Sequence, residues 1–126
     1  MLRLGDTDMT RIGLGTNRLT NTPEHVAFVR EAVGLGVNMI DTAHTYTGGQ
    51  SEETIGAALS PVPEDCIVAT KGGYAPGDGR PAVLRSQIEE SLRRLRAEVI
   101  DLYYLHRVHP DTPLEESVGA IAAYRD

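Results

Sequence analysis

Four short apolar runs alternate with four longer amphipathic stretches along the 126-residue chain, and this alternation limits the possible folds more than any other feature. The apolar runs cover residues 12–15, 37–43, 66–71 and 99–106, and a polar residue lies at the end of each run or directly after it. Short, nearly continuous apolar runs are typical of parallel strands that are covered on both faces. Met39, Val68 and Leu102, which occupy corresponding points in the last three runs, lie 29 and 34 residues apart. Because a strand and its crossover helix take about 30 residues, the spacing predicts repeated βα units.

The stretches between the runs carry helix signals. Thr22 and Pro23, a capping residue followed by a first-turn proline, predict a helix that ends near residues 34–36. Further helices are expected over residues 51–59 and 81–95, and a fourth begins at residues 112–113. In the third helix, charged residues of opposite sign recur four positions apart, and we interpret them as a solvent-exposed face. We read His44 as a surface residue, and residues 2–10 can pair as a small hairpin.

Two α/β architectures accept this order of elements. One is an open doubly wound sheet, and the other is a (β/α)8 TIM barrel of about 250 residues. Residues 13–18 (GLGTNR) lack the third glycine of a dinucleotide-binding fingerprint, and no Walker lysine motif occurs. If the chain is a barrel, it supplies about the first four βα units, so residues 1–126 are the N-terminal half of a single domain.

Composition restricts the class of partner. Twelve basic and 18 acidic residues give a formal charge of −6, which argues against a nucleic-acid partner. The single cysteine, Cys66, cannot form an internal disulfide and suits a reducing compartment. No apolar stretch is long enough to cross a membrane, so we expect a cytoplasmic protein without a membrane partner. His106 and His109 lie three positions apart but have no third ligand at a recognisable spacing, so we predict no metal site.

Chemically reactive side chains follow the predicted strands. In both architectures ligands gather at the carboxyl ends of the strands, and the residues expected at those ends include Asp41, Tyr46, Lys71 and His106. A phenol has a pKa of about 10, which is too high for an efficient proton donor near neutrality. A nearby ammonium lowers that pKa, a carboxylate can hold the ammonium, and an imidazole can bind or protonate a substrate oxygen. Alone, Asp41 and Lys71 fit a structural ion pair equally well. Their occurrence with Tyr46 and His106 at successive strand ends favours a shared site.

Several motifs occur together in one order. They are GLGT at residues 13–16, DTA at 41–43 with Tyr46 three positions on, SE at 51–52 before IGAAL at 55–59, TK at 70–71, and DLYYLHR at 101–107. In order and spacing this series resembles the N-terminal half of the aldo-keto reductases, and it extends over essentially the whole chain.

The resemblance implies a (β/α)8 barrel that binds NADP(H) without a Rossmann domain. It also implies a catalytic tetrad of Asp41, Tyr46, Lys71 and His106, acting on a small aldehyde or ketone. Tyr46 is then the general acid, Lys71 lowers its pKa, Asp41 positions Lys71 and His106 orients the substrate. The cofactor-binding positions carried over from the family are Gly15, Thr16, Asn17 and Asp41, near the nicotinamide ribose of NADPH.

The chain also departs from the family pattern. Family members often have glycine directly after the catalytic tyrosine, whereas Tyr46 is followed by TGGQ, a longer loop that can reshape the substrate entrance. The family's carboxamide ligands, its ring stacked on nicotinamide and its basic cluster for the 2′-phosphate come from the second half of the barrel. We expect them to be absent from a chain that ends at Asp126.

Two alternative functions stay open at this point. One is a nucleotide-binding regulatory subunit of the same fold, like the β-subunits of potassium channels. The other is a catalytically incomplete half-barrel that self-associates or pairs with the missing half. The physiological substrate cannot be read from the sequence, because the loops that select it lie largely downstream.

Overall fold

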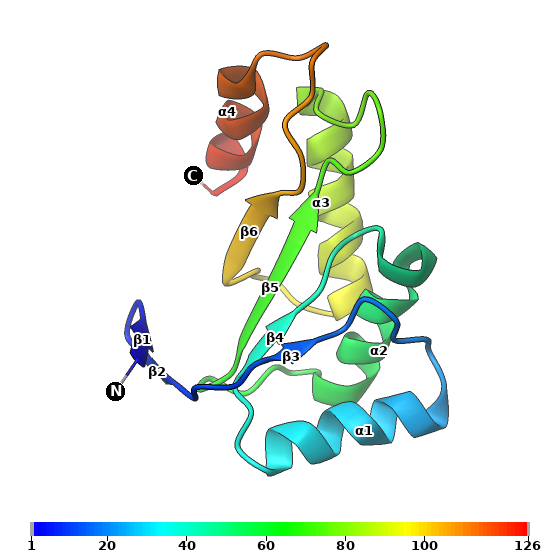
Figure 1. Ribbon diagram of the computed structural model, residues 1–126, viewed down its shortest axis with the longest axis vertical. Helices are drawn as coiled ribbons and strands as arrows, with labels where there is room; N and C mark the ends of the chain where they lie inside the picture. The colour runs from blue at the N-terminus through cyan, green and yellow to red at the C-terminus, as the bar shows by residue number, and fades with distance from the viewer. Residues whose placement is uncertain (1, 126) are drawn as a thin grey trace.

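A four-stranded parallel sheet forms the centre of the computed structural model, which describes residues 2–125 (Figure 1). Its strands are β3 (Leu14–Gly15), β4 (Met39–Asp41), β5 (Ile67–Gly72) and β6 (Leu102–Leu105). They lie side by side in sequence order, each parallel to the next. A doubly wound sheet reverses its strand order, whereas a barrel adds each new strand beside the last. The observed order is that of a barrel.

The helices follow the predicted alternation. They are α1 (Pro23–Gly34), α2 (Gln50–Leu59), α3 (Pro81–Leu95) and α4 (Leu114–Arg125), with a short 3-10 turn η1 (Tyr46–Gly49) before α2. The hydroxyl of Thr22 accepts a hydrogen bond from the His25 N–H and so caps α1, as its sequence predicted. Three of the four strands are shorter than the apolar runs that predicted them, whereas β5 has the six residues of its run. For example, Val99 is apolar but lies before β6 and is 73% exposed.

A predicted hairpin precedes the sheet. Strands β1 (Leu2–Leu4) and β2 (Thr7–Met9) pair antiparallel. The side chain of Asn38 fixes the hairpin to the sheet, because its amide donates to the carbonyl oxygens of Asp8 and Asp65 and its Oδ1 accepts from the Thr10 N–H. The hairpin therefore lies beside the start of β4 and β5, away from the carboxyl ends of the strands (Figure 1).

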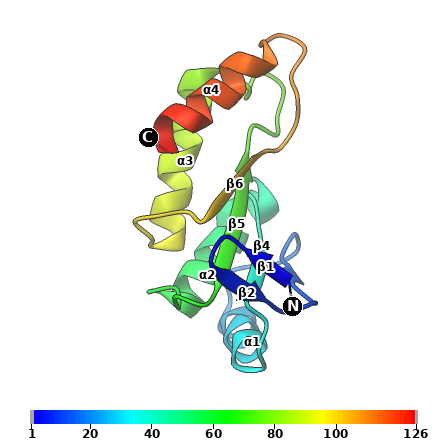
Figure 2. The ribbon, with the colours of Figure 1, turned by 90° about the vertical axis from the view of Figure 1, so that its left-hand side faces the viewer.

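The core lies between the sheet and its helices (Figures 1 and 2). It is built from aliphatic side chains and one thiol: Leu19, Val29, Ile40, Ile55, Leu59, Cys66, Val68 and Leu95. Burial raises the pKa of the Cys66 thiol to about 11, with Asp65 and Asp101 adding to the shift, so the residue acts as a small apolar side chain. Gly56 lets α2 approach α3 closely, since a Cβ at this position would collide with the carbonyl oxygen of Arg94.

Side-chain alternation along the strands decides what faces the helices. Ile40 and Thr70 point to the helix side, where Ile40 joins the core and Thr70 bonds Glu52 of α2. Their neighbours Asp41 and Lys71 therefore point to the other face, which is the interior of the barrel. Within residues 2–125, no helix is both long and apolar enough to cross a membrane.

Candidate active site

Lys71 lies at the centre of the candidate site. Its ammonium nitrogen donates to the Tyr46 hydroxyl at 3.0 Å, to Asp41 Oδ2 at 3.0 Å and to the Thr42 carbonyl oxygen at 2.8 Å. An ammonium has three protons to donate, and these contacts use all three. The side chain is 17% exposed, so it is held in one direction within the rim of the sheet.

The surroundings of Lys71 keep it charged. Burial by itself lowers the pKa of the ammonium, but the hydrogen bonds to Tyr46 and Asp41 and the charges of these partners outweigh it. The net result is a raised pKa, so Lys71 is protonated at neutral pH. A fixed cation thus lies 3.0 Å from the phenol oxygen.

His106 completes the set of four. Its ring meets the Tyr46 ring edge-on, with centroids 5.9 Å apart, and the Tyr74 ring at 4.9 Å. Burial, together with the charges of Lys71 and Arg107, lowers the pKa of the imidazole, while Asp41 acts in the opposite direction. The ring is therefore neutral at pH 7. Its Nδ1 is buried and has no hydrogen-bond partner among the described residues.

The electrostatic balance at His106 gives a testable expectation. In an NMR titration, the pKa of the His106 imidazole should lie below the ordinary value of 6.5. Lys71→Met should raise the midpoint by removing a positive charge, although burial, the largest cause, keeps it from returning fully. Asp41→Asn should lower it further. A His106 midpoint that did not respond to Lys71→Met would contradict the assigned contribution of Lys71.

The predicted cofactor-binding positions lie next to Asp41 but differ in accessibility. Gly15 pairs with Asp41 in the sheet, and a Cβ there would meet open space. Asn17 is exposed. Thr16 is almost fully buried, and its hydroxyl donates to the Asp41 carbonyl oxygen at 2.8 Å and accepts from Ser51 at 2.7 Å. The Thr16 hydroxyl therefore holds the end of β4 in place, while Gly15 and Asn17 are exposed.

The loop after Tyr46 takes an unusual course. Thr47, Gly48 and Gly49 all have positive φ angles, of 49°, 65° and 100°. Three successive left-handed residues turn the chain sharply into α2. Glycine accepts this conformation at little cost, whereas Thr47 is held in it by a hydrogen bond from its hydroxyl to the Leu19 carbonyl oxygen. The longer TGGQ loop expected from the sequence is thus a compact turn beside the phenol.

A charged network that contacts this loop was not predicted from the sequence. The charged side of α3 was interpreted as solvent-exposed, but Arg94 is largely buried and pairs with both Glu90, at 2.7 Å, and Glu52, at 3.2 Å. Arg94–Glu90 is the only one of the expected i,i+4 pairs that forms within residues 2–125. His44, read as a surface residue, has its Nε2 2.6 Å from Glu90 Oε1. A signal was present in α2, because Glu52 shares a helical face with the apolar residues at positions 55 and 59.

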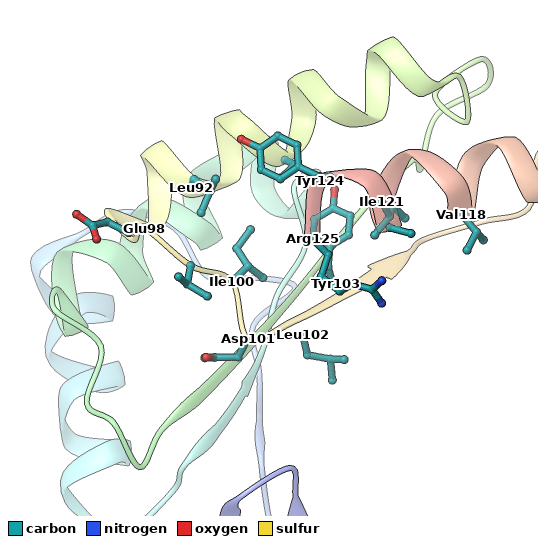
Figure 3. A pocket seen from close by; sticks show the side chains of 13 residues that line it. Leu92, Glu98, Ile100, Asp101, Leu102, Tyr103, Val118, Ile121, Tyr124 and Arg125 are labelled. Atoms are coloured by element: carbon teal, nitrogen blue, oxygen red, sulfur yellow. The ribbon is translucent and has the colours of Figure 1, made fainter.

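Two cavities in the described part of the chain differ in their distance from the site. A small one of about 210 Å³ adjoins the tetrad and is bordered by Lys71, His106, Tyr74 and Gln87 among others. The larger groove, of about 550 Å³, lies away from the tetrad between α3, α4 and β6, where Leu92, Ile100 and Tyr103 gather (Figure 3). Among residues 2–125, no group of three or more His, Cys, Asp or Glu side chains could hold a metal ion.

Acid–base groups gathered at the carboxyl edge of a parallel βα sheet are typical of βα-barrel enzymes. Comparison with known proteins makes the class specific, since the model of the aldo/keto reductase family matches residues 11–126. The chain belongs to the aldo-keto reductase family.

Individual relatives agree with this assignment. An uncharacterized oxidoreductase of Bacillus subtilis is 34% identical over 94% of this chain and 42% of its own length. Human aflatoxin B1 aldehyde reductase member 2 is 39% identical over 85% of this chain and 32% of its own length. The chain thus spans less than half of the length of these relatives.

Solved structures give the same result for the fold. An aldo-keto reductase of Bacillus halodurans in its holo form superposes with a TM-score of 0.84 at 31% identity, covering 98% of this chain and 45% of that one. An aldo-keto reductase of Klebsiella pneumoniae in complex with NADPH gives a TM-score of 0.79 at 32% identity, covering 91% and 41%. The chain therefore has the fold of about four βα units of an aldo-keto reductase (β/α)8 barrel.

Proposed function

We propose that this chain carries the acid–base half of an NADP(H)-dependent reductase that converts a small aldehyde or ketone to an alcohol. The observation that carries the proposal is the Lys71 ammonium, which hydrogen-bonds Tyr46 and Asp41 at 3.0 Å each. In this proposal Tyr46, Lys71, Asp41 and His106 act as one catalytic unit.

Each of these residues has a separate task. When bound, the nicotinamide supplies the hydride. The Tyr46 hydroxyl donates its proton to the substrate oxygen, and Lys71, 3.0 Å away, stabilises the phenolate that is left. Asp41 and the Thr42 carbonyl oxygen hold Lys71 in position. The neutral His106 ring hydrogen-bonds the substrate oxygen and so fixes its direction toward Tyr46.

The residues around Asp41 fit the ribose end of a nicotinamide cofactor. The Asp41 side chain is 42% exposed although Oδ2 is bonded to Lys71, so its carboxylate can also accept from a ribose hydroxyl. Open space next to Gly15 and the exposed amide of Asn17 lie on the same rim. The choice of NADPH is supported by the Klebsiella relative, which was solved with NADPH.

We also propose that residues 1–126 are the N-terminal half of one barrel domain. Strand β6 is an edge of the described sheet, and apolar side chains beside it are exposed, including Val99, Tyr104 and Val118. Val99 and Val118 line the 550 Å³ groove between α3, α4 and β6 on the helix side of the sheet (Figure 3). A further βα unit would pair with the edge and cover the groove.

Turnover separates this function from the regulatory alternative. The full-length protein is mixed with NADPH and a panel of aldehydes and ketones, and loss of NADPH is followed by absorbance. A reductase oxidises NADPH in proportion to the alcohol formed. A regulatory subunit binds NADPH without consuming it, and that outcome would replace the proposal.

Lys71→Met tests the electrostatic part of the mechanism. Without the cation, the phenol holds its proton more firmly. The rate of reduction should fall, and the alkaline limb of its pH profile should move to higher pH because the acid stays protonated longer. The measurement is kcat/KM against pH for both proteins. A loss of rate that is uniform at every pH would assign Lys71 a positional role only.

A further inference from the structure

A partly buried ion-pair network connects α2 and α3 to the loop that carries Tyr46. It consists of His44, Glu52, Glu90 and Arg94, and we call these four residues the loop anchor. None of them belongs to the tetrad. Arg94 contacts the other three members, and His44 and Arg94 also border the small cavity beside Lys71 and His106.

One member of the loop anchor, Glu52, is fully buried. Glu52 is 0% exposed, and its two carboxylate oxygens accept from the Thr70 hydroxyl at 2.7 Å and from Arg94 Nη1 at 3.2 Å. Thr70 immediately precedes Lys71 in β5. A buried carboxylate is tolerated only when it is paired and hydrogen-bonded. Glu52 therefore fixes Arg94 against the strand that presents Lys71.

Arg94 also contacts the loop itself, at residues before and after Tyr46. Arg94 Nη1 also donates to the His44 carbonyl oxygen at 2.8 Å, two residues before Tyr46. On the other side of Tyr46, a Cβ at Gly49 would come within 2.5 Å of Arg94 Cζ, so the guanidinium fills the space that glycine leaves free. One planar group thus contacts the loop on both sides of the phenol.

His44 is held by its side chain as well. Its Nε2 lies 2.6 Å from Glu90 Oε1, the same oxygen that accepts from Arg94 Nη2 at 2.7 Å. The hydrogen bond with His44 is the largest contribution to a lowered pKa of Glu90, which keeps this carboxylate charged. The His44 N–H donates to the Lys71 carbonyl oxygen at 2.9 Å. His44 therefore connects the loop to α3 through Glu90 and to β5 through Lys71.

We propose that Arg94, supported by Glu52 and Glu90, is a positioning residue that sets the Tyr46 hydroxyl against Lys71. The inference rests on the proposed role of Tyr46 as the general acid. Buried ion pairs contribute little net stability when compared with apolar packing, but this one is directed at the backbone of a single loop. Misplacing a catalytic group by about 1 Å can cost on the order of 100-fold in rate.

The test compares two anchor variants with two controls from the same helix in the full-length protein. Arg94→Met removes the central contact, and Glu90→Ala removes a partly exposed partner whose loss the fold should tolerate. Arg93→Met and Glu89→Ala are the matched controls. The Arg93 side chain is 69% exposed and reaches Glu90 only at 4.0 Å, and Glu89 is exposed on the same helix.

Activity is the first readout. Carbonyl reduction is normalised to the sites that bind NADPH, so that unfolded protein is not counted. We expect Arg94→Met to lower kcat by about 10–100-fold and Glu90→Ala by a smaller factor, with the Kd for NADPH within about twofold of the parent. Both controls should keep the parent kcat. A normal kcat in folded Arg94→Met would overturn the inference, even if its Tm fell.

The second readout does not depend on turnover. The protein is labelled with 3-fluorotyrosine, and the Tyr46 resonance is assigned by its loss in Tyr46→Phe. Because the Tyr46 ring lies 5.9 Å from the His106 ring, a displaced phenol should shift or broaden this resonance. The anchor variants should move it and the controls should not. If the parent reduced no carbonyl, the proposed function would fail, and an unmoved resonance in Glu90→Ala and Arg94→Met would separately refute the positioning role.

Discussion

Tyr46→Phe in the full-length protein is expected to abolish carbonyl reduction while leaving NADPH binding nearly unchanged. The substitution removes the proton donor, and general acid catalysis contributes on the order of 10²–10⁴-fold. The phenylalanine ring can keep the edge-on contact with His106, whereas the hydrogen bond from Lys71 is lost. The measurements are kcat with a reactive aldehyde and the Kd for NADPH. A variant that kept most of its kcat would remove Tyr46 from the mechanism.

The 126-residue chain alone, as a monomer, is expected to reduce no carbonyl at a measurable rate. Its sheet has two unpaired edges, at β3 and β6. Side chains on the interior face lack an opposite layer, and Tyr104 is 45% exposed. Unpaired edges favour association with other chains, so the fragment should dimerise, aggregate or remain partly molten unless a second half covers it.

Residues 1–126 are also expected to hold only part of the proposed cofactor. Asp41, Gly15 and Asn17 reach only the ribose end proposed for the nucleotide, so NADPH should bind weakly even to a folded monomer. Positioning of reactants can supply about 7–11 kcal/mol of the barrier reduction in such sites. Tyr46 and Lys71 can therefore be correctly placed while no hydride donor is held against the substrate.

Size-exclusion chromatography, NADPH titration and an aldehyde assay on the purified fragment test this expectation together. The expected set of results is an associated or poorly folded species, weak binding and no turnover. A well-folded monomer that bound NADPH tightly and reduced aldehydes would show that the rest of the barrel contributes little to the site.

The order of elements could be predicted from the sequence because burial and spacing determine it. The four apolar runs became β3 to β6, and the third helix lies over residues 81–95 as predicted. The strand lengths could not be predicted, because an apolar residue such as Val99 looks the same in a strand as at an exposed edge. Only pairing between distant segments decides where a strand ends.

Part of the site could likewise be predicted from the sequence, and part of it could not. Asp41, Lys71 and Tyr46 were predicted together because polar residues at successive strand ends share one rim, and the structure brings them within hydrogen-bonding distance. The contacts of Arg94 and His44 were missed, because residues 50 positions apart carry no mutual signal in one sequence. The buried hydroxyl of Thr16 was equally hidden, since its partner Ser51 lies in α2.

The most direct test of the proposed carbonyl reduction traces the hydrogen that NADPH transfers to the substrate. The full-length protein is incubated with an aldehyde and NADPH deuterated at the transferable position of the nicotinamide. The proposed function predicts an alcohol with one deuterium on the former carbonyl carbon, and Tyr46→Phe should lose this product while still binding NADPH. Alcohol without deuterium, or NADPH that stays bound and unoxidised with every carbonyl compound supplied, would contradict the proposed function.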